Sequence, residues 1–160
     1  MFLNSMQLAT SQATMNDFQE ACVAAKIRVL LADDYKLVRQ GIREILESSD
    51  DITIIAEAEN GEQALELAEK IEPDVTMLDI QMPVMSGIDA ARAIRSLSPK
   101  ARIMMLSAYN EEAYVKAILG LGINAYLLKT CELNELLEAI RAVVRGETFI
   151  QSGLLLVGNS

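Results

Sequence analysis

Polar side chains stand where apolar stretches of the sequence end. Asp33 and Asp34 follow the first stretch and Asp79 follows the third, while Ser107 and Lys129 follow the fourth and fifth. Carboxylates are the ligands that a hard cation such as Mg²⁺ prefers. A hydroxyl and an ammonium group suit the oxygens of a phosphoryl group. The five side chains together are of the types that phosphoryl chemistry at a divalent cation needs.

Each of these residues alone also has an ordinary structural explanation. Asp33, Asp34 or Ser107 could cap the helix that follows it, and Lys129 could be a solvated surface lysine. These explanations weaken when the residues are taken together, because apolar strands would bring all of them to one edge of a sheet. Three carboxylates at one edge repel one another unless a cation lies between them.

The composition excludes several other kinds of chemistry. The chain has 160 residues and no histidine, which rules out Ser-His-Asp and Cys-His catalysis and every zinc site with a histidine ligand. Its two cysteines, Cys22 and Cys131, are too few for a four-thiolate site and too far apart in sequence to indicate a disulfide framework. The formal net charge of −9 disfavours binding of DNA or RNA by these residues.

The expected location is the cytoplasm, with no membrane contact. The N-terminus lacks the basic start of an export signal, and two free thiols fit a reducing compartment. No apolar run approaches the ~20 residues that a membrane-spanning helix needs.

Strand and helix patterns alternate along most of the chain, which is typical of repeated βαβ units. Strands are predicted at 27–32, 52–58, 75–78, 103–106 and 125–128, and helices within 37–46, 64–71, 88–94, 113–119 and 133–144. The first, third and fourth strands are almost continuously apolar, as in central parallel strands. The second strand places Thr53 and Glu57 on one face, which indicates an edge. The pattern predicts a three-layer α/β domain around a five-stranded, doubly wound parallel sheet.

The two ends of the chain differ from this pattern. Residues 1–25 are expected to be a flexible leader with a short helix near its end. The domain itself is expected at 26–146. Residues 147–160 are expected to be a tail, or the stump of a linker to an output domain absent from the sequence.

Five spaced motifs resemble the receiver domain of two-component response regulators. They are VLLADD at 29–34, AENGEQAL at 58–65, PDVTMLDIQMP at 73–83 followed by Gly87, LSA at 106–108 and LLK at 127–129. The match covers about three quarters of the chain and most resembles the subfamily whose receivers precede a helix-turn-helix DNA-binding domain. The resemblance implies a flavodoxin-like sheet with strand order 2-1-3-4-5.

The resemblance also implies a role for each site residue. Asp79 would be the phosphoacceptor. Asp34 and Asp79 would bind Mg²⁺ together with the backbone carbonyl of Gln81, and Asp33 would act through a bound water.

Four further residues would respond to the phosphoryl group. Lys129, the Ser107 hydroxyl and the Ala108 amide would contact it, and Ser107 with Tyr126 would form the switch. One departure from the family pattern is Thr130, which stands where the family usually has a proline in a cis peptide.

The implied function is a phosphorylation-dependent signalling switch rather than an ordinary enzyme. The switch would catalyse its own phosphorylation and dephosphorylation, and its partner would be a histidine kinase or a phosphotransfer protein. Transcription would be regulated through a DNA-binding domain outside this chain. A homodimer could form through the fifth helix or the surface beside it.

Three alternatives belong to other classes. An Asp-nucleophile phosphatase would place a second acid two residues after Asp79, where this sequence has Gln81. A flavodoxin-like cofactor binder would need a Ser-, Thr- and Gly-rich phosphate loop where Asp33 and Asp34 stand. The third alternative is a stand-alone receiver that acts by protein–protein contacts.

Overall fold

Strands and helices alternate throughout the part of the chain that the computed structural model describes, residues 26–108 and 112–151. The strands are β1 (Ile27–Ala32), β2 (Ile52–Ala58), β3 (Val75–Asp79), β4 (Ile103–Ser107), β5 (Ala125–Leu128) and β6 (Phe149–Ile150). The helices are α2 (Lys36–Glu47), α3 (Gly61–Ile71), α4 (Gly87–Leu97), α5 (Glu112–Gly120) and α6 (Leu133–Val144). The predicted leader 1–25 and residues 152–160 of the predicted tail lie outside the described residues.

All strands pair in parallel in the order β2-β1-β3-β4-β5-β6. The predicted order 2-1-3-4-5 is confirmed, and β2 is an edge strand as its sequence indicates. The structure adds β6, which pairs with β5 and was not predicted because two residues carry no readable period. The amide of Leu128 extends this pairing by donating to Gln151 Oε1 at 2.7 Å.

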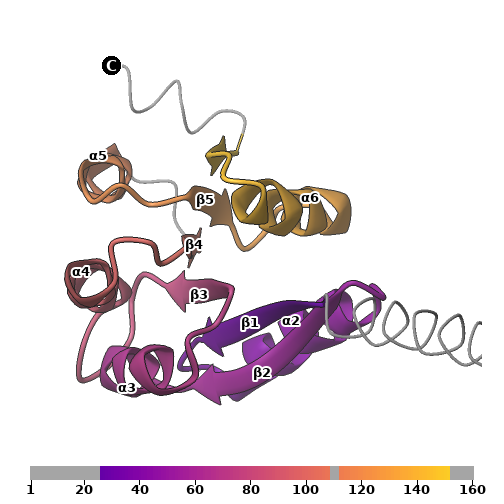
Figure 1. The fold of residues 1–160 in the computed structure, drawn as a ribbon, viewed down its shortest axis with the longest axis horizontal. Helices are drawn as coiled ribbons and strands as arrows, with labels where there is room; N and C mark the ends of the chain where they lie inside the picture. Colours follow the sequence, from indigo (N-terminus) through magenta and orange to yellow (C-terminus); the bar gives the residue numbers. More distant parts are fainter. Residues whose placement is uncertain (1–25, 109–111, 152–160) are drawn as a thin grey trace, which may run out of the picture.

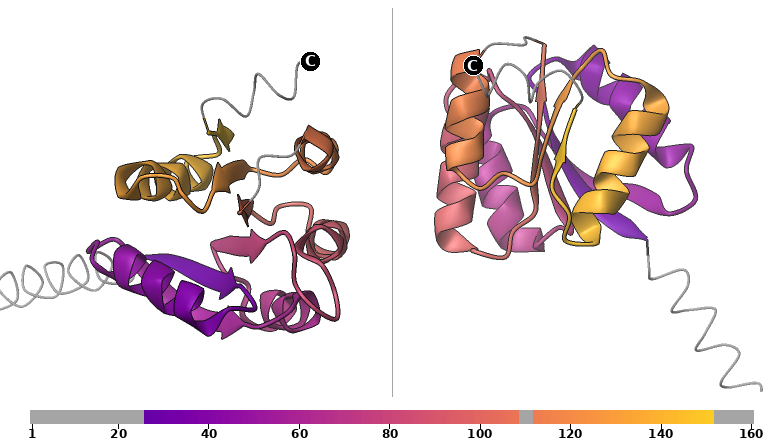
Figure 2. Two further views of the ribbon diagram at one scale, coloured as in Figure 1. Left: turned by 180° about the vertical axis from the view of Figure 1, so that it is seen from behind. Right: turned by 90° about the horizontal axis from the view of Figure 1, so that it is seen from above.

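Helices cover both faces of the sheet and complete three layers. α2 and α6 lie on one face, and α3, α4 and α5 lie on the other (Figures 1 and 2). Each face has its own apolar core. One contains Val29, Leu46 and Ile140, and the other contains Leu78 and Ile94. β3 and β4 are buried along their whole length, which explains their continuous apolar sequences.

One apolar residue of the helix predicted within 37–46 does not face the sheet. Leu37 lies in α2, but 81% of it is exposed. Arg39 is buried instead, with 7% exposed, and it lies on the same helix face as Ile42 and Leu46. The sheet-facing side of α2 therefore holds a cation near its N-terminus.

Turn residues fix the starts of α3 and α4 at the edge where the strands end. The side chains of Asn60 and Ser86 cap these helices by accepting from the amides of Gln63 and Asp89. Gly87 packs so tightly that an added Cβ would lie 1.8 Å from the carbonyl oxygen of Asp79. The β3–α4 connection is therefore pressed against the last residue of β3.

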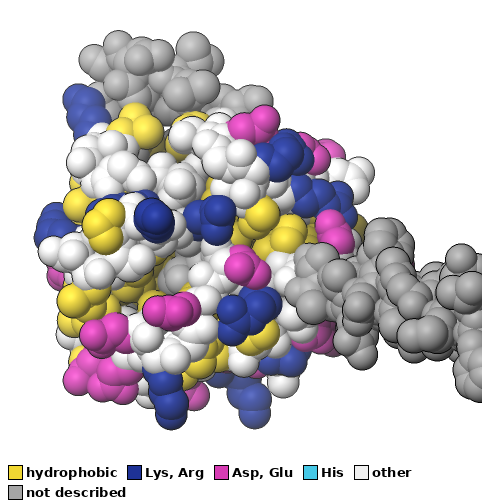
Figure 3. All heavy atoms as spheres, viewed as in Figure 1, with side chains coloured by type: hydrophobic (Ala, Val, Ile, Leu, Met, Phe, Trp, Pro, Cys, Tyr) yellow, Lys and Arg dark blue, Asp and Glu magenta, His cyan; other side chains and the backbone are white. Residues whose placement is uncertain are grey.

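The exposed side of α3 is acidic. Glu62, Glu66 and Glu69 are exposed on this helix, and acidic side chains gather over it in the space-filling view (Figure 3). Such a surface disfavours contact with a phosphate backbone. Within residues 26–108 and 112–151, every helix is too short or too polar to cross a membrane.

Candidate functional site

The carboxylates at the ends of β1 and β3 come together because of the strand register. Ala32 of β1 lies opposite Leu78 of β3, so the residues that follow each of them are neighbours. Asp33, Asp34 and Asp79 each offer a carboxylate oxygen, and these oxygens all lie within 4.8 Å of one another. The cluster expected from the sequence is therefore present at the carboxyl edge of the sheet.

Asp33 is held on several sides. Its amide donates to the carbonyl of Ala58 at 3.1 Å, and its Oδ1 accepts from the amide of Tyr35 at 2.9 Å. Its Oδ2 lies 2.7 Å from Lys129 Nζ. The N-cap of α2 is Tyr35, which makes no side-chain capping bond. The simple helix-cap explanation for Asp33 and Asp34 is therefore wrong.

Lys129 connects the acids to the far side of the site. It directly follows β5, and its Nζ lies 3.2 Å from Asp79 Oδ2 in addition to the contact with Asp33. Its amide donates to the carbonyl of Ser107 at 2.7 Å, which fixes the backbone across two strands. The Lys129–Thr130 peptide is trans. Thr130 thus leaves the lysine aimed at the acids.

Burial and charge shift the titration of this cluster. Burial raises the pKa of the Asp79 carboxyl, and Asp33 and Asp34 raise it further, while Lys129 acts in the opposite direction. Burial alone would lower the pKa of Lys129, but its hydrogen bond to Asp33 and the charge of Asp79 raise it above the ordinary value. One ammonium group thus faces three carboxylates, and a further cation would balance their charge.

Asp34 provides the test of whether a cation fits. Its Oδ1 is buried and has no hydrogen-bond partner, which is costly for a carboxylate unless a cation or water satisfies it. The other donors in the cluster are oxygens, and a hard divalent ion such as Mg²⁺ prefers oxygen ligands. The residues present therefore fit Mg²⁺.

A pocket of about 350 Å³ opens beside these acids. Its lining includes Asp34, Asp79, Gln81, Ser107, Ala108 and Lys129. These are the residues expected from the sequence to contact the metal or the phosphoryl group, apart from Asp33, which is buried and is not part of the lining. Ser107 is 1% exposed.

Tyr126, the other predicted switch residue, lies in the core. It is fully buried on the α3–α4–α5 face, in a cluster that includes Met105, Val115 and Ile118. Its ring is therefore already inside the protein in this structure.

Two supporting contacts were missed by the sequence analysis. Arg39 donates from Nη1 to the main-chain carbonyl of Asp33. Gly61 donates its amide to the carbonyl of Met85 at 3.0 Å and thereby holds the β3–α4 loop. Arg39 could have been found from its helical spacing to Ile42 and Leu46, which places it on the sheet-facing side. The contact of Gly61 with Met85 could not be predicted, because the Asn60-Gly61 pair indicates a turn but not its partner.

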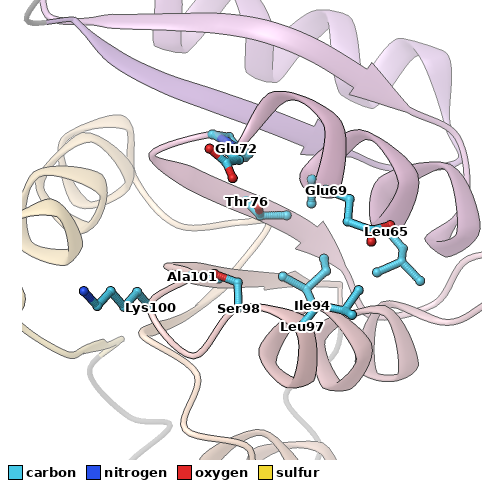
Figure 4. Close-up of a pocket in the computed structure, with 11 residues that line it drawn as sticks. Leu65, Glu69, Glu72, Thr76, Ile94, Leu97, Ser98, Lys100 and Ala101 are labelled. Atoms are coloured by element: carbon cyan, nitrogen blue, oxygen red, sulfur yellow. The ribbon is translucent and has the colours of Figure 1, made fainter.

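A second pocket lies at the opposite edge of the sheet, and Asp33, Asp34 and Asp79 are not in its lining. It measures about 270 Å³ and lies between the C-terminal ends of α3 and α4. Leu65, Ile94 and Leu97 line its apolar part, and Lys100 extends away from them (Figure 4). It has no part in the chemistry of the carboxyl edge.

Comparisons with known proteins agree with this geometry. The family model described as the response regulator receiver domain matches residues 29–141, well over half of the chain. The transcriptional regulatory protein DegU of Brevibacillus brevis is 37% identical over 125 residues, which cover 78% of this chain and 53% of DegU. The chain thus spans about half the length of this relative.

Solved structures show the same similarity. The signal receiver domain of the putative response regulator NarL from Mycobacterium tuberculosis superposes with a TM-score of 0.73 at 36% identity, covering 76% of this chain and 98% of that one. A chain of the CheX–CheY–BeF₃–Mg²⁺ complex from Borrelia burgdorferi gives a TM-score of 0.69 at 29% identity, covering 73% and 88%.

Proposed function

Because the chain belongs to the response regulator receiver domain family, we propose that it is a phosphorylation-controlled signalling switch with the carboxylate of Asp79 as phosphoacceptor. The observation that carries this proposal is the position of Asp79. It is the last residue of β3, lines the pocket at the carboxyl edge and lies 3.2 Å from Lys129 Nζ. Its carboxylate can be reached from the pocket although only 7% of the residue is exposed.

The proposed phosphoryl donor is a phosphohistidine on a histidine kinase or phosphotransfer protein, so the histidine would belong to the partner and none is needed in this chain. An oxygen of Asp79 attacks phosphorus and forms a P–O bond while the P–N bond to the donor imidazole breaks. The electron pair returns to the imidazole nitrogen, which takes up a proton from solvent. Transfer of this kind depends on positioning and charge neutralisation more than on acid–base catalysis.

The acid cluster is the proposed Mg²⁺ site. Asp34 and Asp79 would bind the ion with the backbone carbonyl of Gln81, and Asp33 would act through a water. When bound, the ion would offset the charge of the acids and of the incoming phosphoryl oxygens. The similarity to a chain from a complex that holds Mg²⁺ and BeF₃ supports this assignment.

Lys129, Ser107 and Ala108 would receive the phosphoryl oxygens. The Lys129 ammonium is paired with Asp33 and Asp79 in this structure. After phosphorylation of Asp79 it can move from the carboxylate of that residue to the new phosphoryl oxygens. The Ser107 hydroxyl and the Ala108 amide would supply further donors from the other side of the pocket. Charge-assisted hydrogen bonds of about 1.5–3 kcal/mol each are strong enough to shift a two-state equilibrium.

Ser107 and Tyr126 would transmit the change. Phosphorylation adds a charge of about −1.5 to −2 and draws Ser107 toward the new oxygens. Because the Tyr126 ring is buried in this structure, phosphorylation would act by stabilising this inward position over an outward one.

The proposed output is regulation of transcription in the cytoplasm. The name of the relative DegU supports it, and DNA contact is assigned to a helix-turn-helix domain outside these residues. Pairing of two copies through α6 or the neighbouring surface belongs to the same proposal. Self-catalysed loss of the phosphoryl group to water would end the signal.

The test is the intact mass of the protein after incubation with acetyl phosphate. We expect one added phosphoryl group, dependent on Mg²⁺ and absent from Asp79→Asn. No adduct on a wild-type protein with an intact circular dichroism spectrum would overturn the proposal and leave a receiver-shaped interaction module.

A further inference from the structure

Arg39 is a buried cation beside the acid cluster that the proposed phosphoryl chemistry does not use. Only 7% of this α2 residue is exposed, and its Nε is buried without a hydrogen-bond partner. Burying a guanidinium group is costly unless its contacts compensate. Its contacts therefore indicate what the fold gains from it.

The strongest of these contacts is with the backbone of the acid pair. Arg39 Nη1 donates to the main-chain carbonyl of Asp33, and this contact is buried. The other two contacts are looser. Nε lies 3.4 Å from Glu57 Oε1 and Nη2 lies 3.6 Å from Glu59 Oε1. The two glutamates flank the guanidinium and leave Nη1 directed at the carbonyl.

That carbonyl belongs to the peptide that joins Asp33 to Asp34. The amide of Asp33 and both of its carboxylate oxygens already have partners. Arg39 fixes the carbonyl, and so sets the plane of the peptide that leads into Asp34. Asp34 Oδ1 is the atom left buried without a partner.

We infer that Arg39 is a positioning residue that locks the Asp33–Asp34 peptide so that the Asp34 carboxylate is preorganised for the divalent cation. This inference rests on the proposed function and assigns a residue that supports its metal site. Removing a group that hydrogen-bonds and orients a metal ligand commonly weakens metal affinity by about 10–100-fold.

Arg43 offers a matched control on the same helix. It also binds Glu57, with Nη2 2.7 Å from Oε2, but it is more exposed than Arg39, and within the described part of the chain its ion pairs are with Glu57 and Glu47 and not with Asp33. If Arg39 served only to tie α2 to β2, loss of Arg43 should have the same effect on the site. A second control, Ile42→Val, trims a residue that packs on the core of the same helix and lowers stability without touching the acids.

The experiment measures the dissociation constant for Mg²⁺ alone by calorimetry on wild type, Arg39→Met, Arg39→Lys, Arg43→Gln and Ile42→Val. We expect Arg39→Met to raise the constant about tenfold. Arg39→Lys, which keeps the charge but not the planar donor group, should fall between wild type and Arg39→Met. Arg43→Gln and Ile42→Val should stay close to wild type. In phosphorylation by acetyl phosphate, Arg39→Met should need more Mg²⁺ for half-saturation yet approach the wild-type rate at saturating Mg²⁺.

The outcomes separate the two proposals. Wild type that binds no Mg²⁺ and forms no phosphoryl adduct would defeat the proposed function. If wild type binds Mg²⁺ and forms the adduct but Arg39→Met has the same Mg²⁺ affinity as wild type, the inference about Arg39 alone is overturned. The same holds if Arg43→Gln loses as much Mg²⁺ affinity as Arg39→Met. If Arg39→Met does not fold, Arg39→Lys decides, because an unchanged constant there would also contradict the role of Arg39.

Discussion

At the scale of single residues, Asp33 and Asp34 are sequence neighbours that the fold treats differently. Asp33 is tied to Tyr35 and Lys129 through its two carboxylate oxygens, whereas Asp34 keeps one buried oxygen without a partner. The sequence places both after β1 and cannot distinguish them, because the partners come from other segments of the chain. The difference suits Asp33 for holding the site together and Asp34 for meeting a cation.

Replacing Asp34 should therefore remove most of the stabilisation that Mg²⁺ gives. Without Mg²⁺, Asp34→Asn removes one of three clustered carboxylates, so its unfolding temperature should rise above that of wild type. With Mg²⁺ at ten times its dissociation constant, wild type should gain about 1.4 kcal/mol, and Asp34→Asn should gain little. Thermal unfolding with Mg²⁺ or with a chelator checks this. A variant that gains as much as wild type would remove Asp34 from the metal site.

A second residue-scale prediction concerns acid stability. Arg141 of α6 and the Ser49 hydroxyl donate to the Asp51 carboxylate, and these contacts hold the pKa of Asp51 well below its ordinary value. A pKa lowered by folding stabilises the protein above the unfolded value of about 3.9, and this contribution is lost as the pH falls toward the folded value. Because the pair is half exposed, Asp51→Asn should cost only about 0.5–1 kcal/mol at neutral pH.

Urea unfolding between pH 7 and pH 3 measures this difference. The gap between wild type and Asp51→Asn should be constant near neutrality and shrink below about pH 4. Asp50→Asn, at the exposed neighbouring residue, removes a carboxylate but leaves the Asp51–Arg141 pair in place and serves as the control. A gap that grew in acid would contradict the assigned ion pair.

At the scale of elements, the β3–α4 connection shows how closely backbone packing controls the site. Gly87 leaves no room for a Cβ, which would lie 1.8 Å from the carbonyl oxygen of Asp79, whereas a Cβ on Gly41 of α2 would meet nothing within 4 Å. Gly87→Ala should cost about 1–3 kcal/mol and slow phosphorylation, because the backbone at Asp79 must move. Gly41→Ala should instead stabilise the protein by about 0.5–1 kcal/mol and leave phosphorylation unchanged.

Chemical denaturation and the rate of adduct formation with acetyl phosphate test both glycine variants. Equal behaviour of the two would show that the close approach at Gly87 has no bearing on Asp79.

The strands differ in how well the sequence predicts them. β3 and β4 are buried on both faces, so their continuous apolar runs identify them as central strands. Once these strands are identified, the position of Asp79 and Ser107 at their carboxyl ends is predicted as well. β6 could not be predicted, since its two residues depend on pairing with β5 rather than on any pattern of their own. Arg39 was missed because a cation in an apolar stripe is normally assigned to solvent.

At the scale of the whole molecule, the fold collects groups from separate strands at one edge and leaves the rest of the surface to other contacts. Asp33 and Asp34 follow β1, Asp79 ends β3, Ser107 ends β4 and Lys129 follows β5. The net charge of −9 over the whole chain and the exposed glutamates of α3 disfavour contact with a phosphate backbone. Under the proposed function, a signal generated at the acid cluster would be passed on through protein contacts.

Under the proposed function, the phosphoryl group is carried by Asp79 and by no other acid of the cluster. The most direct measurement is borohydride reduction after incubation with acetyl phosphate and Mg²⁺, followed by peptide mass spectrometry. An acyl phosphate on Asp79 should be reduced to homoserine at that residue, with Asp33 and Asp34 unchanged. Homoserine at Asp33 or Asp34, or an unreduced Asp79 in protein that carries the added phosphoryl mass, would contradict the assignment of Asp79 as phosphoacceptor.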